Sequence, residues 1–389
     1  MTSETNSFSS RWYHRAGIWL GIGINPAAIT LGGGLASRLP VEVLVWLMPM
    51  GILLLGFVTV GLSILGFRNR APFGKLARTI FGVGLGGILL NILMALGMSG
   101  WNGFQLGLTG TGLSNLLGAP LWVGVLLMGA FAFSLSRLPL NSWSYVTWLA
   151  TLSSVGLAVF SLVVVREWEV SAVTPSDTFT LPTVIWVIAT ILAYAALFTL
   201  RSADFAWDMH HQKDILIDGL LFTTILIIAS FIGLMLYRAT GDWNLAEIFA
   251  QTSLPWLGNL FLVLSLLSPL MSTVHSGSLA WEQILPISQR NGAFLLLGAG
   301  ILLGVTRFDR QLLPFLDWIG TVSPAAVFVM LAVGFSRKQT PTAVALFAWI
   351  AGSIVGLALK LNGNLSFLAW SIGVAMGVLL IGRMIAKKD

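Results

Sequence analysis

The sequence predicts an all-α integral membrane protein with about twelve transmembrane helices, and two observations lead to this fold class. Hydrophobic residues make up 56% of the 389 residues and charged residues only 9%, whereas soluble domains carry roughly 25% charged residues. The apolar residues form long continuous runs, and a helix needs about 20 residues to cross a bilayer. A transmembrane β-barrel would instead show short segments of alternating polarity.

The first half of the chain contains six such runs. The first begins after Arg15 and is too long for the apolar core of a signal peptide, so we expect a retained helix. Pro26 lies inside it and removes a backbone donor, which predicts a break near the membrane centre. In order, the six predicted spans are Gly17–Ser37, Glu42–Gly66, Phe81–Leu108, Pro120–Leu135, Ser144–Val165 and Pro182–Leu200.

The second half contains six more runs, of which the ninth is short. The eighth is rich in serine and threonine, and these side chains either join helices by hydrogen bonds or offer oxygen ligands to a small cation. In order, these spans are Ile215–Tyr237, Leu254–Trp281, Gly292–Val305, Gln311–Phe335, Pro341–Lys360 and Leu365–Ile381.

The placement of basic residues supports this map. With both termini in the cytoplasm, most of the 21 lysines and arginines fall on the cytoplasmic side, as the positive-inside rule requires for an even number of spans. This asymmetry explains a pI near 10.0 without a nucleic-acid partner. We therefore expect a multi-pass protein of the cytoplasmic (inner) membrane.

Trp101 and Gln105 lie one helical turn apart in the third span, so they share one face of that helix. A planar ligand such as a nucleobase suits this pair, because the indole offers a stacking face and the amide a donor and an acceptor. The pair also fits a tryptophan packed at a helix interface and a glutamine bonded to a nearby backbone. These two residues alone leave both interpretations open.

Acidic residues are nearly absent from the predicted spans. Asp317 is the one that lies clearly within an apolar helix, whereas the others lie in loops or near helix ends. A proton relay usually needs carboxylates deep in the bilayer, so Asp317 is either a one-residue relay or a packing or gating partner. We prefer sodium coupling, because the spans offer hydroxyl and carbonyl oxygens.

Motifs of enzyme chemistry do not occur. The chain has no HExxH, no glycine-rich phosphate loop and no Ser-His-Asp spacing, and it contains no cysteine. We therefore expect a transporter rather than an enzyme, with no cofactor other than a coupling ion.

Several segments together resemble the nucleobase–cation symporter-1 family of cytosine, purine, allantoin and hydantoin permeases. The run Gly100-Trp101-Asn102-Gly103-Phe104-Gln105 resembles the family's Gly-Trp-Phe-Gly-x-Gln motif. Three further matches follow the family's order: Arg78 with Phe81-Gly82, Ser202-Ala203-Asp204-Phe205, and Phe315 to Arg337. Prokaryotic cytosine permeases and the hydroxymethylpyrimidine transporters are the nearest branches.

The resemblance implies a LeuT-like core of two inverted five-helix repeats, with the first and sixth helices broken, plus two C-terminal helices. The domain boundaries that we expect are an N-terminal tail at 1–16, a first repeat at 17–166, a second repeat at 182–335, and the two added helices with a short basic tail at 341–389.

The resemblance also implies two sets of site residues. The family's stacking tryptophan and pocket glutamine fall on Trp101 and Gln105, and other substrate-binding positions fall on Tyr194, Phe198 and Ser276. The family's cation site falls on the hydroxyls of Ser272 and Thr273 and on carbonyls at Ile24, Ala27 and Pro269. The pocket expected from these residues carries no fixed charge.

The chain departs from the family at three places. The sixth span has no Gly or Pro between Thr183 and Arg201 to explain its expected break, and Ala195 replaces the second aromatic of the pocket. Val274 and other eighth-span residues stand where relatives often have asparagine. These changes leave the substrate open.

From the sequence we expect a symporter that imports a neutral, planar nitrogen heterocycle, such as a nucleobase or a pyrimidine- or hydantoin-like compound. Its partners are this substrate, Na⁺ (or H⁺) and the lipid bilayer, and it works by alternating access. Two alternatives remain: a proton-coupled amino-acid or amine permease of the same superfamily, which needs Asp317, and a non-transporting polytopic membrane protein.

Overall fold

The computed structural model describes residues 12–138, 140–167, 179–336 and 339–386, and the regular structure within these ranges is entirely helical. Most of the expected tail at 1–16 and the last three residues of the expected basic tail lie outside the described residues. In chain order the elements are α1 (Trp12–Gly23), α2 (Pro26–Ala36), α3 (Val41–Asn69), α4 (Phe73–Phe81), η1 (Gly82–Gly86), α5 (Gly87–Leu117), α6 (Leu121–Ser136), α7 (Leu140–Glu167), α8 (Leu181–Tyr194), α9 (Ala196–Arg201), η2 (Ser202–Phe205), α10 (Gln212–Thr240), α11 (Leu245–Ala250), α12 (Pro255–Ser265), α13 (Leu267–Ile284), α14 (Gln289–Val305), η3 (Phe308–Gln311), α15 (Leu312–Gly334), α16 (Thr342–Leu361) and α17 (Phe367–Ile385).

Each of the expected spans is present as one helix or as two consecutive helices. In the described part of the chain, nine segments are long and apolar enough to cross a membrane, and α8 with α9 forms one further, bent span. The helices α6 and α14 are apolar but shorter, as the sequence predicts for α14. The all-helical, multi-pass fold class is therefore confirmed, while the repeat boundaries at 17–166 and 182–335 stay a prediction.

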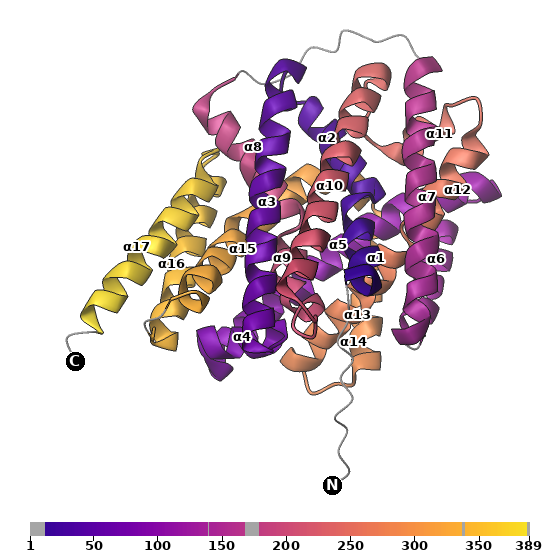
Figure 1. Ribbon diagram of the computed structural model, residues 1–389. Coiled ribbons are helices and arrows are strands. Elements are labelled where there is room, and N and C mark those ends of the chain that lie inside the picture. Colours follow the sequence, from indigo (N-terminus) through magenta and orange to yellow (C-terminus); the bar gives the residue numbers. More distant parts are fainter. Residues whose placement is uncertain (1–11, 139, 168–178, 337–338, 387–389) are drawn as a thin grey trace.

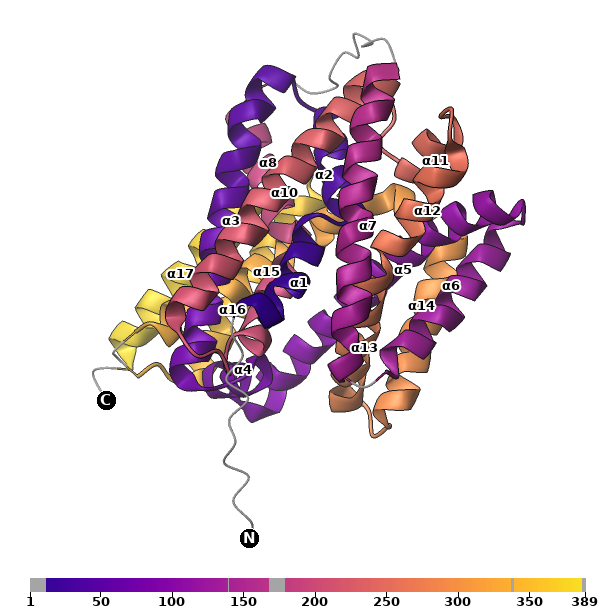
Figure 2. The same cartoon turned by 45° about the vertical axis from the view of Figure 1, so that its right-hand side comes forward.

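The helix α5 occupies the centre of the molecule. Figures 1 and 2 show α16 and α17 together at one edge and α6, α11 and α12 at the opposite edge. Every residue of α5 from Gly97 to Gly112 is buried, so helices surround this segment on all sides. A helix that is buried all round is suited to carry the polar residues of an internal site.

The glycines of α2 allow a very close approach to α10. A Cβ atom at Gly32 would lie 1.8 Å from the carbonyl oxygen of Ser230, and a Cβ at Gly233 would lie 1.8 Å from that of Ile29. Small residues at helix contacts are a common packing solution in membranes, since dispersion and backbone contact replace the hydrophobic effect there. Any side chain at Gly32 would force α2 and α10 apart.

The helix α4 lies between the second and third spans that the sequence predicts. Its buried residues Leu76, Ala77 and Ile80 face the protein, whereas Lys75 and Arg78 are exposed. This one-sided pattern is typical of a helix that lies along the membrane surface.

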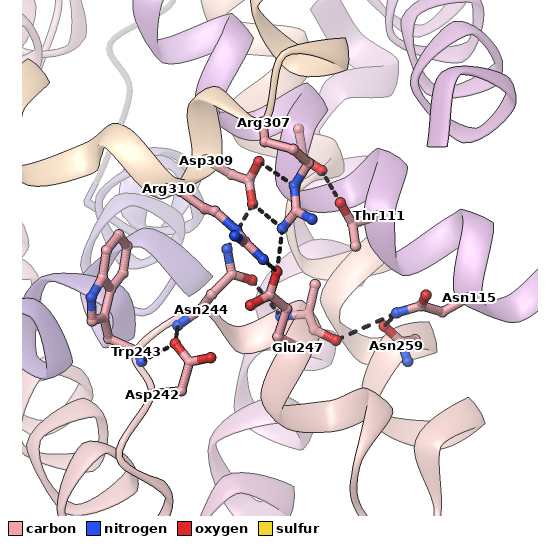
Figure 3. Close-up of polar contacts among 12 residues, drawn as sticks. Thr111, Asn115, Asp242, Trp243, Asn244, Glu247, Asn259, Arg307, Asp309 and Arg310 are labelled. Atoms are coloured by element: carbon pink, nitrogen blue, oxygen red, sulfur yellow. Dashed lines mark hydrogen bonds and ion pairs between the residues drawn. The ribbon is translucent and has the colours of Figure 1, made fainter. Parts of the chain in front are cut away.

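A cluster of polar side chains joins the connection between α10 and α12 to the connection between α14 and α15 (Figure 3). Asp309 is fully buried and accepts hydrogen bonds from Asn244 Nδ2 at 2.6 Å and from Arg307 at 3.0 and 3.1 Å. Glu247 forms ion pairs with Arg307, at 2.7 Å, and with Arg310. The cluster satisfies a carboxylate that would otherwise be buried without a partner.

Candidate functional site

A cavity of about 90 Å³ lies where the junctions of α1 with α2 and of α8 with α9 meet α5 and α13. Its volume exceeds several-fold the 10–15 Å³ or so that one water molecule needs. The lining residues are Ile18, Ile22, Asn25, Met98, Trp101, Gln105, Tyr194, Ala195, Leu197, Phe198, Arg201, Phe205, Pro269, Ser272, Thr273 and Ser276.

The break in the first span follows from Asn25-Pro26. Asn25 caps α2, because its Oδ1 accepts a hydrogen bond from the Ala27 N–H at 2.8 Å, and Pro26 occupies the first helical position. The Asn25 Nδ2 donates to the Ile22 carbonyl oxygen at 3.0 Å. The asparagine therefore satisfies backbone groups on both sides of the break, which proline alone would leave open.

The sixth span also breaks, although no glycine or proline causes it. The chain bends by 48° between α8 and α9, at Ala195, whose φ of −113° and ψ of 17° leave the helical range. The Tyr194 hydroxyl donates to the Ile22 carbonyl oxygen at 2.8 Å. This bond links the two breaks, so the bend at Ala195 coincides with a contact between distant segments rather than with a local helix-breaking residue.

Trp101 and Gln105 both face the cavity from α5. The Trp101 side chain lies within edge-to-face distance of three rings, with centroid separations of 5.8 Å to Phe104, 5.7 Å to Tyr194 and 5.6 Å to Phe315. Trp101 is 8% exposed and Gln105 6% exposed. The indole is therefore held in place by its neighbours while part of it remains accessible from the cavity.

The eighth span contributes hydroxyl groups next to Gln105. Thr273 Oγ1 lies 2.7 Å from Gln105 Oε1, to which it donates, and it also contacts the Pro269 carbonyl oxygen. Ser272 Oγ donates to the same carbonyl at 3.0 Å. The Gln105 Nε2 makes no hydrogen bond to any residue that the structure describes, so its two N–H groups are available to a ligand carbonyl.

Eight of the ten site residues expected from the sequence line this one cavity. They are Trp101, Gln105, Tyr194, Phe198, Pro269, Ser272, Thr273 and Ser276. Ile24 and Ala27 do not line it: Ile24 lies in the break and Ala27 in the first turn of α2, and both are buried. The cation-site role given to these two carbonyls stays a prediction.

Two polar lining residues were missed from the sequence. The predicted break in the first span rests on Pro26 alone, although asparagine directly before a proline is a helix-start signal that identifies Asn25. Arg201 was counted as a charge at the cytoplasmic end of the sixth span. The expectation of a pocket without fixed charge is therefore wrong, because a guanidinium group lines the cavity.

A second cavity shares lining residues with this one, and a third shares lining residues with the second. A cavity of about 40 Å³ shares Ile18, Arg201 and Ser272, among others, with the central cavity. A larger one of about 410 Å³, at the ends of α6, α7, α13 and α14, shares Trp143 and His275 with the second. The three cavities form a series that runs from the centre of the molecule toward one end of the helix bundle.

The two carboxylates that bear on proton coupling have different surroundings. Asp317 accepts a hydrogen bond from Trp186 Nε1 at 2.8 Å and forms an ion pair with Lys360, so it joins α15 to α8 and α16. Asp218 in α10 is fully buried, and neither of its carboxylate oxygens has a hydrogen-bond partner among the described residues. In the sequence, Asp218 lies near the start of the seventh predicted span, among the acidic residues expected near helix ends.

Comparisons with known proteins show the fold. No protein-family model and no curated protein sequence matches the chain. The solved structure titled as the inward-facing conformation of Mhp1 has a TM-score of 0.73 at 16% identity, covering 100% of this chain and 95% of that one. A second Mhp1 structure, described as a nucleobase-cation-symport-1 family transporter in a closed conformation with bromovinylhydantoin bound, has a TM-score of 0.75 at 16% identity, covering 100% of this chain and 96% of that one.

A third similar structure is a Na⁺-coupled sialic acid symporter in a substrate-bound outward-open state. Its TM-score is 0.67 at 12% identity, covering 98% of this chain and 90% of that one. The LeuT-like arrangement expected from the sequence is thus confirmed as a fold. At these identities the likeness carries no substrate or ion to this chain.

Proposed function

We propose that this protein is a secondary active transporter of the nucleobase–cation symporter-1 type that carries a planar nitrogen heterocycle across the cytoplasmic membrane. One observation carries the proposal: Trp101, Gln105 and Thr273 line a single cavity at the junction of two broken helices. Sites at broken helices near the midplane are where transporters of this architecture bind their substrates.

In this proposal the ring of the substrate lies against the Trp101 indole, and a ring carbonyl accepts hydrogen bonds from Gln105 Nε2. The Thr273 hydroxyl donates to Gln105 Oε1 at 2.7 Å and thereby orients the amide toward the ligand. A neutral ring suits the part of the cavity beside Trp101 and Gln105, because a cationic ring would be desolvated there with no carboxylate among the described lining residues.

The coupling ion that we propose is Na⁺. Pro269, Ser272 and Thr273 present a carbonyl and two hydroxyl oxygens on consecutive turns of α13, and all three line the cavity. Unwound carbonyls of broken helices coordinate Na⁺ in this class of transporter, which supports Ile24 and Ala27 as further ligands. Binding of the cation there would tie the first span to the eighth.

Proton coupling is the alternative, and one observation favours it. Asp218 is a carboxylate buried in a membrane-spanning helix, and neither of its oxygens has a hydrogen-bond partner among the described residues; proton relays use carboxylates in such places. Asp317 is a poorer candidate, because Lys360 and Trp186 already bind its two oxygens.

A thermal-shift screen of the purified protein tests the function. Nucleobases, hydantoins and thiamin precursors are each added in Na⁺ buffer and in choline buffer, since a ligand that binds the folded state raises the melting temperature. We expect a shift with at least one planar heterocycle, larger in Na⁺, and saturable uptake of that compound into proteoliposomes. A protein that binds amino acids or amines but no heterocycle would contradict the proposal.

Uptake into proteoliposomes, measured at several pH values, separates sodium coupling from proton coupling. Sodium coupling predicts that Asp218→Asn keeps the sodium dependence of uptake. Proton coupling predicts that uptake follows an imposed pH gradient without Na⁺ and that Asp218→Asn abolishes this dependence.

A further inference from the structure

Among the described residues that line the central cavity, Arg201 is the one that carries a charge. It is the last residue of α9, and its side chain is only 13% exposed. The same side chain also lines the adjoining cavity of about 40 Å³. A guanidinium therefore lies at the boundary between the central cavity and the adjoining one.

The position of this guanidinium is fixed through its ε nitrogen. Arg201 Nε donates to Asp204 Oδ2 at 2.9 Å, and Asp204 Oδ1 accepts a hydrogen bond from the Phe73 N–H at 2.7 Å. The Phe205 ring lies 6.0 Å from Arg201 Cζ. The carboxylate thus anchors the arginine between η2 and α4 and leaves its far end unbound.

The two η nitrogens of Arg201 make no hydrogen bond to any residue within the described ranges. An arginine carries five N–H donors, and the bond to Asp204 uses one. The other four lie in the terminal fork, whose geometry matches a carboxylate through two parallel hydrogen bonds. No carboxylate side chain occurs among the described residues that line the central cavity, so none of them occupies that fork.

We propose that the transported heterocycle bears a carboxylate substituent that binds the η nitrogens of Arg201. This inference rests on the proposed function and adds a substrate class to it. The ring lies against Trp101 and Gln105 in the central cavity, and the carboxylate extends toward the adjoining cavity, which gives it room. The bond between Arg201 and Asp204 keeps the fork oriented before the substrate arrives.

Pairs of compounds that differ only in a carboxylate test this inference. Binding to the detergent-purified protein in Na⁺ buffer is measured by isothermal titration for uracil against orotate and for 5-methylhydantoin against hydantoin-5-acetate. We expect the acid of at least one pair to bind more tightly than its neutral partner. Arg201→Gln is then expected to raise the Kd of that acid about 10- to 150-fold, the range for loss of a hydrogen bond to a charged group, and to change the Kd of the neutral partner less than threefold.

Two further variants control for folding and for general charge effects. Arg201→Lys keeps the positive charge without the fork, so it should bind the acid with a Kd between those of the wild type and Arg201→Gln. Arg78→Gln removes an exposed arginine of α4 outside the cavity and should leave both Kd values unchanged. If Arg201→Gln does not fold, Arg201→Lys tests the contact instead. A Kd of the acid in Arg201→Lys equal to that of the wild type would overturn the bidentate contact.

The outcomes that overturn the inference differ from those that overturn the proposed function. A neutral compound that binds as tightly as its acid, or an acid preference that survives in Arg201→Gln, refutes the role of Arg201 and leaves the transporter intact. Failure of all four compounds and of the wider heterocycle screen refutes the proposed function, and the substrate class with it.

Discussion

Replacement of Trp101 by alanine removes the surface on which the substrate ring is proposed to stack. Stacking of a base on an aromatic side chain contributes about 1–3 kcal/mol by alanine substitution, which corresponds to a rise in Kd of about 5- to 150-fold. Trp101 also contacts Phe104, Tyr194 and Phe315, so its loss enlarges an existing hollow. Removal of a buried tryptophan costs roughly 3–5 kcal/mol of stability, and a site that already borders a cavity should fall near the lower end.

The assay must separate these two effects. We would measure the Kd of the best heterocycle from the screen by titration at a temperature well below the melting temperature of each variant. Trp101→Phe keeps an aromatic face and should retain most of the affinity. Trp46→Ala is the matched control, because this indole is 74% exposed on the outer surface of α3. A folded Trp101→Ala protein that binds with the wild-type Kd would refute the stacking site.

Three more predictions follow from contacts in and around the site. Ser272→Ala combined with Thr273→Ala should remove the sodium dependence of ligand binding. This dependence is measured as the difference between the ligand-induced shifts of the melting temperature in Na⁺ and in choline buffer, and an unchanged difference would exclude this ion site. Tyr194→Phe deletes the hydrogen bond between the two helix breaks and should lower stability by about 1 kcal/mol, measured by denaturation in detergent, and no loss of stability would show that the bond does not hold the sixth span. Glu247 is partly buried, and burial alone would raise its pKa, but hydrogen bonds from its two arginine partners outweigh this effect and hold the pKa below its ordinary value. The stabilising contribution of Glu247 is therefore present above the unfolded-state pKa of about 4.3 and is lost as the pH falls through the lower folded-state pKa. The wild-type protein should lose more thermal stability on acidification than Glu247→Gln. An equal fall of the melting temperature with pH in the two proteins would contradict this.

The sequence predicts the helices well because membrane helices must satisfy their own backbone and must be apolar over a fixed length. Pro26 likewise predicts the break in the first span, because proline lacks the backbone N–H that a continuous helix needs. The break at Ala195 has no such signal. It coincides with the hydrogen bond from Tyr194 to a carbonyl oxygen of α1, and one sequence does not reveal a contact across the fold.

Some residues of the candidate site could likewise be predicted from the sequence, and others could not. The spacing of Trp101 and Gln105 places both on one helix face, and the pairing of Ser272 with Thr273 follows from adjacent positions. Arg201 was missed because a basic residue at the end of an apolar run is normally a solvated interfacial charge. In the structure, Asp204 of η2 accepts a hydrogen bond from Arg201 Nε and another from the Phe73 N–H at the start of α4. This arrangement holds the arginine where it lines the cavity.

The polar cluster of Figure 3 shows the same limit for loop residues. From the sequence alone, Asp309 and Glu247 are expected to be ordinary solvated charges in two separate connections. The fold buries Asp309 completely and pairs both with arginines. Such pairing depends on which loops meet, which helix periodicity does not encode.

The central claim is that a planar heterocycle occupies the hollow between the two helix breaks. A crystal or cryo-electron microscopy structure of the protein with the tightest-binding compound of the screen tests it most directly. The account predicts ligand density against the Trp101 indole, within hydrogen-bonding distance of Gln105 Nε2. Density for the same compound elsewhere on the protein, with this hollow filled by side chains, would contradict it.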